Sequence, residues 1–249
     1  NVNITETPEM TLSIDPITED NVLNDEESKG DVEVTGTVSG ATAGQTVIVS
    51  VNGIDYNGTV DAGGTTWTAS VAGSALLEDE DKAVNAKIAT NATEFVTAFK
   101  EYEVDTQGPV VIEPGPGVVE EGTVAVELDT ITSDNIIDLL ESQDGALTDI
   151  PVSGTVTGDF SAGDAVVVNV NGNEYTGSVN ANGTFSIDVP KEQLINDPDT
   201  KVEVRVSASD AAGNVTEVPA EKLYNVNITE TPEMTLSIDP ITEDNVLND

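Results

Sequence analysis

The chain begins and ends with the same 25 residues. The segment 1–25 recurs without a single change at 225–249, a distance of 224 residues. Self-similarity at a fixed distance is typical of a tandem array, in which each repeat stacks on the next. We therefore expect one full period of an array, followed at 235–249 by the first strand of the next repeat.

A second, weaker repeat divides this period in two. Residues 14–28 match residues 128–142 at a distance of 114 residues. Further along, Val51-Asn52-Gly53 matches Val170-Asn171-Gly172, so the order of matches is kept. The sequence thus predicts two homologous units of about 100 residues, which is the usual size of one small domain.

Each unit has the pattern of short β-strands joined by tight turns. The β-branched runs 47–51 and 166–170 are each followed by Asn-Gly, which favours a hairpin turn. Residues 202–208 alternate apolar and polar side chains, as a half-buried strand does. This pattern indicates an all-β fold, with tandem immunoglobulin-like β-sandwiches in an elongated rod. Only single helical turns are expected, at 73–79 and 191–196.

Prolines and glycines gather between the two units and set the predicted domain boundaries. Because proline fixes φ, this linker should be extended and stiff. The predicted organisation is a linker at 1–10, a first domain at 11–105, the Pro/Gly linker at 106–123, a second domain at 124–224, a linker at 225–234 and the start of the next repeat at 235–249.

The composition excludes several functional classes. The chain has 47 Asp and Glu residues against 8 Lys and Arg residues, a formal net charge of −39. It should repel the phosphates of a nucleic acid or of an anionic membrane, so neither is an expected partner. With no Cys and no His it has no zinc site of the Cys/His kind and no Ser-His-Asp triad, and we expect no enzyme. No apolar run reaches the length of about 18 residues that a membrane span requires.

The candidate site is an acidic, amide-bearing loop that follows the first expected strand of each unit. The loops at 20–27 and 134–141 keep oxygen donors at matching positions while most residues between them change. Ca²⁺ takes about six to eight such oxygens from a flexible loop. The alternative is a plain polar turn, because Asp and Asn are common in turns. The matching pairs are Asp20 with Asp134, Asn21 with Asn135, Asn24 with Asp138 and Glu27 with Glu141.

Sandwich topology is expected to bring more donors to these loops. The loop after the first strand lies at the end of the sandwich where the last strand leaves, close to Asp105. The loop at 210–214, between the last two strands of the second unit, should face that end. Carboxylates gathered there would repel one another unless a divalent cation lay between them. The predicted metal ligands are Asp20, Asn24, Glu27, Asp105, Asp134, Asp138, Glu141, Asp210 and Asn214.

The order of these short motifs resembles the bacterial Ig-like tandem repeats in the extender region of giant type I-secreted RTX and biofilm-associated adhesins. The motifs are DN-x-x-N/D-x-x-E, GTV-x-G, VNG-x-x-Y, DAAGN and DT-x-x-P, and they cover nearly the whole chain. The resemblance implies an extracellular spacer at the bacterial cell surface that projects a ligand-binding region for cell adhesion or biofilm formation. It also implies Ca²⁺ in the acidic loops and joints, with calcium ions and neighbouring repeats as partners. Without Ca²⁺ such a rod would bend at its joints.

Three places depart from that pattern. Residues 90–93 replace DAAGN in the first unit, and 227–232 lacks the aspartate of DT-x-x-P. Both segments meet at the junction between periods, which should bind calcium more weakly or use Glu230 differently. The insert at 113–117 is longer than a four-residue joint. It could hold the units too far apart for one ion to touch both, which would leave Asp210 to bind alone or not at all.

The alternative function is a carbohydrate- or protein-binding Ig-like module. Trp67, Phe185, Tyr56 and Tyr175 could stack on sugars, but their matched positions on expected strands favour a place in the core. The run at 78–81 is interpreted as solvated charge. An aromatic patch in one unit only would favour the binding module. Head-to-tail contacts through the duplicated end segment remain open.

Overall fold

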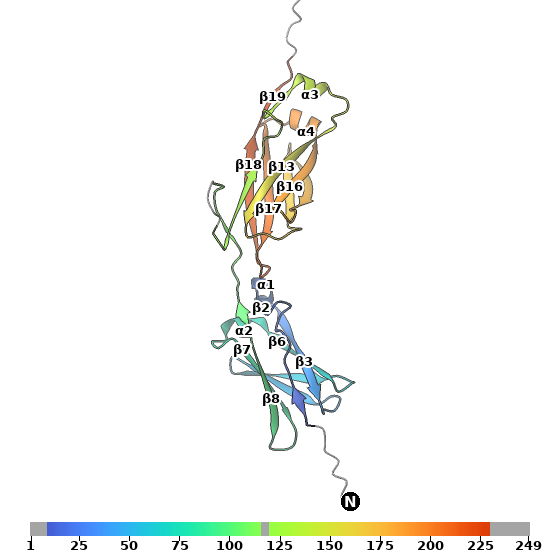
Figure 1. Cartoon of the computed structure of the whole chain (residues 1–249), viewed down its shortest axis with the longest axis vertical. Helices are drawn as coiled ribbons and strands as arrows, with labels where there is room; N and C mark the ends of the chain where they lie inside the picture. Colours follow the sequence, from blue (N-terminus) through green and yellow to red (C-terminus); the bar gives the residue numbers. More distant parts are fainter. Residues whose placement is uncertain (1–8, 116–119, 230–249) are drawn as a thin grey trace, which may run out of the picture.

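The protein consists of two β-sandwiches placed end to end along the long axis of the molecule (Figure 1). The structure is a computed structural model that describes residues 9–115 and 120–229. The predicted start of the next repeat at 235–249 lies outside these residues, as do Glu230 and parts of the linkers predicted at 1–10 and 225–234. Across the described residues, no helix has the length and apolar character needed to span a membrane.

The first unit is built around one sheet that folds over its own core. Its strand order is β1-β3-β6-β5-β4-β7-β8, and β5 pairs with both β4 and β6. The strands are β1 (Thr11–Leu12), β3 (Asp31–Ser39), β4 (Thr46–Val51), β5 (Ile54–Val60), β6 (Thr66–Ala72), β7 (Ala83–Ala89) and β8 (Phe95–Glu101), with β2 (Val22–Leu23) and β9 (Glu103–Val104) paired in parallel beside them. The helices are α1 (Asp25–Lys29) and α2 (Gly73–Glu78).

The second unit has two facing sheets. One has the order β10-β11-β13-β16 and the other β15-β14-β17-β18. The first consists of β10 (Val110–Val111), β11 (Thr123–Leu128), β13 (Asp149–Gly158) and β16 (Thr184–Pro190), and the second of β14 (Ala165–Val170), β15 (Asn173–Ser178), β17 (Lys201–Ser209) and β18 (Val215–Leu223). A parallel pair, β12 (Ile136–Asp138) with β19 (Asn225–Asn227), and the helices α3 (Leu139–Gln143) and α4 (Lys191–Ile195) complete it.

The predicted turns and single-turn helices are confirmed. Asn52-Gly53 joins β4 to β5, and Asn171-Gly172 joins β14 to β15, with positive φ at all four residues. Positive φ at both central residues is what a two-residue hairpin turn of type I′ requires, and Asn-Gly adopts it at low cost. The helices α2 and α4 lie where single turns were expected.

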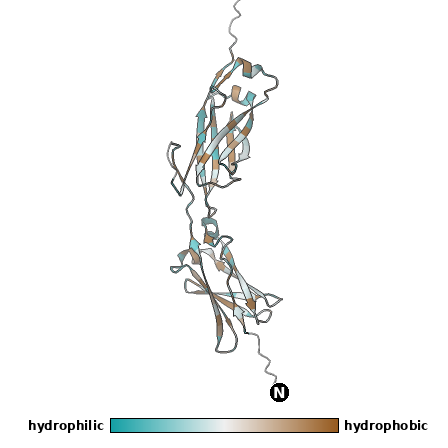
Figure 2. Cartoon of the chain, in the orientation of Figure 1, coloured by the Kyte–Doolittle hydropathy of each residue, from teal (hydrophilic) through white to brown (hydrophobic). Residues whose placement is uncertain are grey.

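Each unit has its own core, centred on one aromatic side chain. Trp67 is fully buried in the first unit and Phe185 is 1% exposed in the second. Apolar and polar residues alternate along the strands that surround them (Figure 2). A Cβ at Gly36 would lie 2.7 Å from the indole nitrogen of Trp67, and one at Gly154 would lie 2.8 Å from the ring of Phe185. The glycine of the repeated Gly-Thr-Val motif therefore makes room for the ring.

The aromatic residues matched between the units belong to these cores. Tyr56 and Tyr175 are half-buried and pack against the same two clusters. The indole N–H of Trp67 donates to the Ser13 carbonyl at 3.0 Å, which satisfies its single polar group. The core interpretation of Trp67, Phe185, Tyr56 and Tyr175 is thus confirmed.

The interpretation of residues 78–81 as solvated charge is wrong for Asp79. This residue is only 4% exposed, and its carboxylate accepts from the Ala83 backbone N–H at 3.1 Å and from the Tyr102 hydroxyl at 3.3 Å. Asp197 and Tyr224 repeat the arrangement in the second unit. Burial and the neighbouring carboxylate raise the pKa of both tyrosines.

The insert between the units does not hold them apart. After residue 109 the chain turns along the second unit, where β10 pairs in parallel with β11 (Figure 1). The backbone N–H groups of Val110 and Ile112 donate to Gly122 and Val124 at 2.8 and 2.9 Å. Only residues 105–109 therefore cross from one unit to the other, and the two units are in direct contact.

Candidate functional site: the joint between the units

The acidic loops lead into short helices, and the matching oxygen-bearing side chains cap those helices. The Asn24 side chain accepts from the Glu27 backbone N–H at 2.9 Å, and the Glu27 carboxylate accepts from the Asn24 backbone N–H at 3.0 Å. Asp138 and Glu141 form the same reciprocal pair at 3.0 and 3.1 Å. These are capping boxes, which satisfy N–H groups that a helix leaves unpaired in its first turn. Capping alone therefore accounts for the match between these two pairs.

The other matching oxygen-bearing residues also form hydrogen bonds with the backbone of their own unit. Asp20 and Asp134 each accept from the backbone N–H two residues further on, both at 3.0 Å. Asn21 and Asn135 have φ values of +68° and +64°, a conformation that Asn tolerates better than most residues. Their amides donate to a carbonyl of the last long strand, at 2.9 and 2.8 Å. The first loop of each unit is thereby tied to the strand that leads out of it.

The joint is the contact between residues 24–25 and 105–108 on one side and residues 210–216 on the other. At its centre lies Asn214, which is 5% exposed. Its Oδ1 accepts from the Asp25 backbone N–H at 2.9 Å, and its Nδ2 donates to the Asp105 carbonyl at 3.0 Å. The same Nδ2 lies 3.1 Å from the Asp210 carboxylate. One amide side chain therefore binds both the first unit and the linker.

A second amide crosses the joint in the opposite direction. Asn24 Nδ2 donates to the Ala212 carbonyl at 3.0 Å. Nearby, the linker packs closely on the second unit, because a Cβ at Gly108 would lie 2.6 Å from the Thr216 hydroxyl and 3.2 Å from the Val215 backbone. The joint is thus held by hydrogen bonds and by a close steric fit.

The structure divides the nine predicted ligands into groups. Asn24, Asp105, Asp210 and Asn214 meet at the joint, Asp105 through its backbone carbonyl. Asp134, Asp138 and Glu141 lie in the loop and helix α3 at the opposite end of the second unit (Figure 1). Asp20 and Glu27 lie in the loop and helix α1 of the first unit.

The side chains at the joint do not fit a metal ion. Among residues 9–115 and 120–229, no group of three acidic side chains is arranged to hold one. Both carboxylate oxygens of Asp210 accept from Asn214, at 2.9 and 3.1 Å. The carbonyls of Asp105 and Ala212, which could bind a cation, accept amide N–H groups instead. Ca²⁺ needs several oxygens directed at one point, and here hydrogen-bond donors lie among them.

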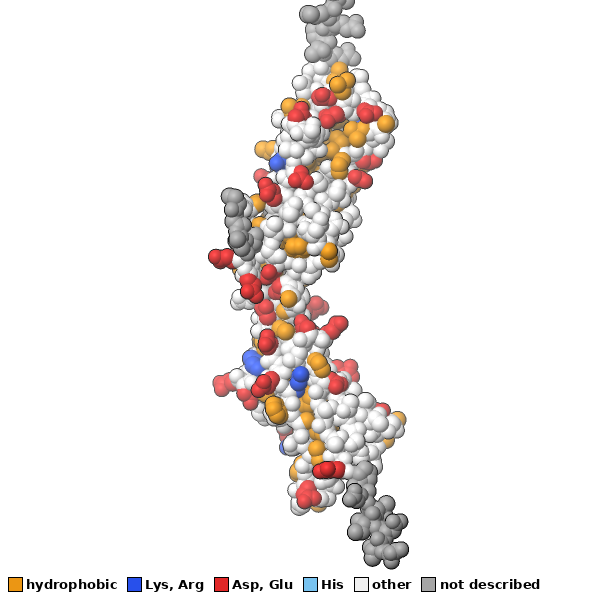
Figure 3. Space-filling view, viewed as in Figure 1, with side chains coloured by type: hydrophobic (Ala, Val, Ile, Leu, Met, Phe, Trp, Pro, Cys, Tyr) orange, Lys and Arg blue, Asp and Glu red, His pale blue; other side chains and the backbone are white. Residues whose placement is uncertain are grey.

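Acidic side chains are spread over both units and over the narrow region between them, while basic ones are few (Figure 3). Four ion pairs occur among the described residues, including Lys29 with Asp25 and Arg205 with Glu174. Exposed pairs of this kind contribute little stability, about 0–1 kcal/mol each. Most of the negative charge is therefore balanced by solvent ions rather than by the protein.

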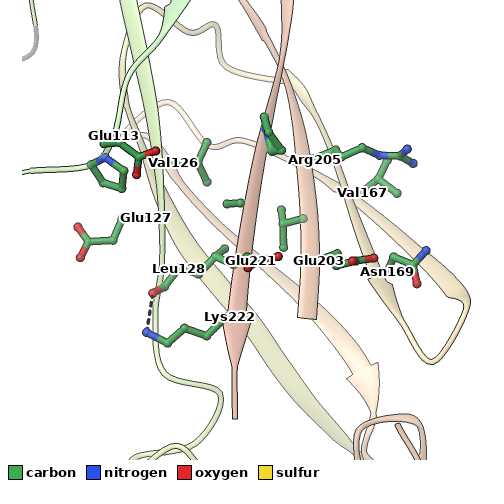
Figure 4. Close-up of a pocket in the computed structure, with 14 residues that line it drawn as sticks. Glu113, Val126, Glu127, Leu128, Val167, Asn169, Glu203, Arg205, Glu221 and Lys222 are labelled. Carbon is green, nitrogen blue, oxygen red and sulfur yellow. Dashed lines mark hydrogen bonds between the residues drawn. The ribbon is translucent and has the colours of Figure 1, made fainter. Parts of the chain in front are cut away.

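A shallow groove of about 790 Å³ lies on the second unit between β11, β17 and β18 (Figure 4). Its charged lining residues include Glu113, Glu127, Arg205 and Lys222. Arg205 pairs with Glu174 at 2.9 Å, and Lys222 donates to the Leu128 carbonyl at 3.4 Å. The Arg205 and Lys222 side chains thus interact with other groups of the protein. Nothing in the sequence distinguished this groove, because most of its charged residues are ordinary outward positions of strands and Val126, Leu128 and Val204 belong to the core.

One exposed aromatic pair was not singled out from the sequence. Phe95 and Phe99 are 51% and 70% exposed and lie on the same face of β8. The strand pairing places Glu217 and Glu221 at the matching positions of the second unit. The sequence held one signal for this pair, because alternation along a strand at 95–99 puts both phenylalanines on the same face. This is an aromatic patch in one unit only, the feature that the sequence associates with a binding module.

The comparisons with known proteins come from solved structures, since no family model and no curated protein matches the chain. A Ca²⁺-stabilized adhesin that helps an Antarctic bacterium reach out and bind ice is 36% identical, with a TM-score of 0.64 over 94% of this chain. This chain spans 53% of that structure. A 1.5-MDa bacterial ice-binding adhesin, studied for host cell surface retention, is 32% identical, with a TM-score of 0.61. That match covers 95% of this chain and 70% of the other.

A bacterial immunoglobulin-like domain from the M. primoryensis ice-binding adhesin is 38% identical, with a TM-score of 0.36, and covers 44% of this chain and 100% of its own. The two longer matches agree with the observed strands, so the predicted all-β fold of tandem Ig-like sandwiches is confirmed.

Proposed function

Because the chain belongs to the bacterial Ig-like repeats of large adhesins, we propose that it is an extender segment, which spaces a distal ligand-binding region away from the cell surface. The end-to-end arrangement of the two sandwiches carries this proposal, since each unit adds its full length to the rod (Figure 1). The proposed location is outside the cell, at the bacterial surface, with neighbouring repeats as partners.

We propose further that Ca²⁺ stabilises the chain through the acidic loops. A net charge of −39 favours divalent cations, and a relative with 36% identity is a Ca²⁺-stabilized adhesin. The proposed ligands are the loop carboxylates of Asp20, Glu27, Asp134, Asp138 and Glu141, whose caps and turns each use one of the two carboxylate oxygens. The proposal does not extend to the joint, where the amides of Asn24 and Asn214 and the Asp25 backbone N–H place hydrogen-bond donors among the oxygens of Asp105, Asp210 and Ala212.

Thermal unfolding at constant ionic strength tests the calcium proposal. A ligand that binds only the folded state raises the melting temperature by mass action, so Ca²⁺ should raise it more than Mg²⁺ or Na⁺. An equal rise with every salt would mean charge screening and would contradict the proposal.

Substitutions by asparagine separate the metal role from the turn role. Asp20→Asn and Asp134→Asn keep an oxygen that accepts the backbone N–H two residues on but remove a negative charge. They should leave the metal-free melting temperature nearly unchanged and reduce the rise with Ca²⁺. Asp61→Asn is the matched control, because Asp61 also accepts backbone N–H groups in a turn but lies outside the candidate loops.

A second candidate function, a carbohydrate- or protein-binding module, is favoured by Phe95 and Phe99 alone. Flat aromatic side chains exposed on one face of a strand suit stacking on apolar faces of a ligand. Screening the chain against immobilised glycans and surface proteins, with the double variant Phe95→Ser/Phe99→Ser as control, tests it. Binding that the double variant abolishes would support the binding module. Identical binding profiles for the two proteins would leave the spacer role as the remaining candidate.

A further inference from the structure

We infer that the joint is locked by side-chain amides, so that the two units keep one relative orientation without a divalent cation. The inference deepens the proposed extender role. The lock itself is argued from the contacts at the joint, and only its consequence, a rod that contains a rigid pair of units, rests on the proposed function. It concerns the contact between residues 24–25 and 105–108 of the first unit and its linker and residues 210–216 of the second.

Asn214 can do at this joint what a cation cannot. Its Oδ1 accepts the Asp25 N–H at 2.9 Å, while its Nδ2 donates to the Asp105 carbonyl at 3.0 Å. A metal ion could bind the carbonyl but would leave the N–H without an acceptor, whereas an amide serves both. Asn214 is 5% exposed, so losing either bond would leave a poorly solvated polar group without a partner.

The lock is reciprocal and close-fitting. Asn24, which caps α1 with its Oδ1, uses its Nδ2 to reach the Ala212 carbonyl at 3.0 Å. Each side of the joint therefore contributes one amide to the backbone of the other. Gly108 packs against Thr216 with no room for a side chain, which fixes the linker beside the second unit. Two amides that reach in opposite directions, with three hydrogen bonds between them, and the close packing at Gly108 together define one orientation.

Within the part of the chain that the structure describes, the amide pair is present only at the two ends that meet. The turn at 210–214 and the turn at 90–94 close in the same way, by backbone bonds of 3.1 and 2.9 Å between their first and last residues. Glu94 is the last residue of the turn in the first unit, as Asn214 is in the second, and Asp138 caps α3 as Asn24 caps α1. Neither carboxylate can donate a hydrogen bond to a carbonyl. The surface around Asn214 therefore fits the α1 end of the first unit and not the α3 end of the second.

Distance measurement by pulsed electron paramagnetic resonance tests the lock in the full chain. The chain has no cysteine, so Ser70→Cys and Ser186→Cys place one spin label on an exposed strand position of each unit. We expect a narrow distance distribution in EDTA that Ca²⁺ leaves unchanged. A broad distribution in EDTA that narrows on addition of Ca²⁺ would overturn the inference.

Variants identify the groups that hold the orientation. Asn214→Ala removes both bonds, and Asn214→Asp keeps an acceptor but removes the donor, so both should broaden the distribution in EDTA. If either variant keeps the narrow distribution, the amide is not the lock. Asn91→Ala is the matched control: it removes the Asn91 amide that caps the turn at 90–94, away from the joint, and should change nothing.

The melting temperature of the same labelled samples keeps the two proposals apart. Both units must still unfold cooperatively in each variant, which separates loss of orientation from loss of folding. If Ca²⁺ fails to raise the melting temperature while the distribution stays narrow, the calcium proposal fails and the lock holds. If Ca²⁺ raises it but the distribution in EDTA is broad, the lock fails and the calcium proposal holds.

Discussion

Tyr102 and Tyr224 tie the end of each unit to its middle. Each hydroxyl donates to a carbonyl in the last turn of a short helix, α2 or α4, at 2.7 Å, and each lies against a buried carboxylate, Asp79 or Asp197. A buried carboxylate is stable only when donors surround it. The tyrosine and the backbone N–H four residues after the aspartate provide those donors.

Removing one hydroxyl should destabilise its unit. Tyr102→Phe removes the single hydroxyl proton that the Leu76 carbonyl and the Asp79 carboxylate share, so we expect the free energy of unfolding of the first unit to fall by about 1–3 kcal/mol. Urea denaturation followed by Trp67 fluorescence measures this, because Trp67 is the single tryptophan and lies in the same core. Tyr56→Phe, at a half-buried position in that core, is the control and should cost less.

Stability should also decline at high pH because of these two tyrosines. Burial raises the pKa of Tyr102 and Tyr224 in the folded state, whereas an unfolded tyrosine titrates near its usual value of about 10. Below that value both states hold the proton, and stability is unaffected. Above it the unfolded state loses protons that the folded state retains, so stability falls as pH rises. The double variant Tyr102→Phe/Tyr224→Phe should show a shallower decline above about pH 10, and an equal decline would contradict this assignment.

Among the elements, helices α1 and α3 show what the sequence could reveal. The strands, the Asn-Gly hairpins and the turns α2 and α4 follow from local patterns and were predicted. The acidic loops were ambiguous, because a capping box and a metal-binding loop use the same oxygen donors at the same spacing. Only the backbone N–H groups that these oxygens accept distinguish the two, and a sequence does not show them.

The contacts at the joint and the burial of the aspartates could not be predicted from the sequence, for a related reason. Sandwich topology indicated that Asp105 and the loop at 210–214 would lie near the first loop. It could not indicate that amides, rather than carboxylates, would make the contacts, because that depends on the relative rotation of two units. Asp79 stood in a run of four acidic residues, so nothing set it apart until the Tyr102 hydroxyl was found beside it.

Capping by Asp138 can be separated from metal binding at the level of helix α3. Asp138→Ala removes the cap and should lower the metal-free free energy of unfolding by about 1 kcal/mol, whereas Asp138→Asn keeps an accepting oxygen and should cost much less. Chemical denaturation in EDTA measures the difference. An asparagine variant as unstable as the alanine variant would show that the charge, and not the cap, stabilises α3.

On the scale of the whole molecule, negative charge is the dominant physical property. A net charge of −39 opposes any compact arrangement, and placing the sandwiches end to end keeps the two charged bodies apart. Between 0.01 and 0.1 M salt the screening length falls from about 30 Å to about 10 Å, which is less than the size of one unit.

Salt should therefore stabilise the chain even without divalent cations. We expect the melting temperature to rise with NaCl up to about 0.1 M and then to change little, because screening is by then shorter than the distance between most charges. Differential scanning calorimetry in EDTA measures the curve. A flat response across the low-salt range would mean that self-repulsion is not a significant cost in this fold.

The direction of the short parallel strands has a mechanical consequence. In each unit the last strand, β9 or β19, runs parallel to β2 or β12 and continues out of the sandwich at that end. When the two ends of the chain are pulled apart, tension slides these strands lengthwise past one another. The bonds from Glu103 and Asp105 to the first loop, at 3.0 and 3.1 Å, then resist together, whereas a hairpin pulled at its open end would lose its bonds one at a time. Each unit thus transmits an applied force to the next through strands loaded in shear, the geometry in which short hydrogen-bonded segments resist the most tension.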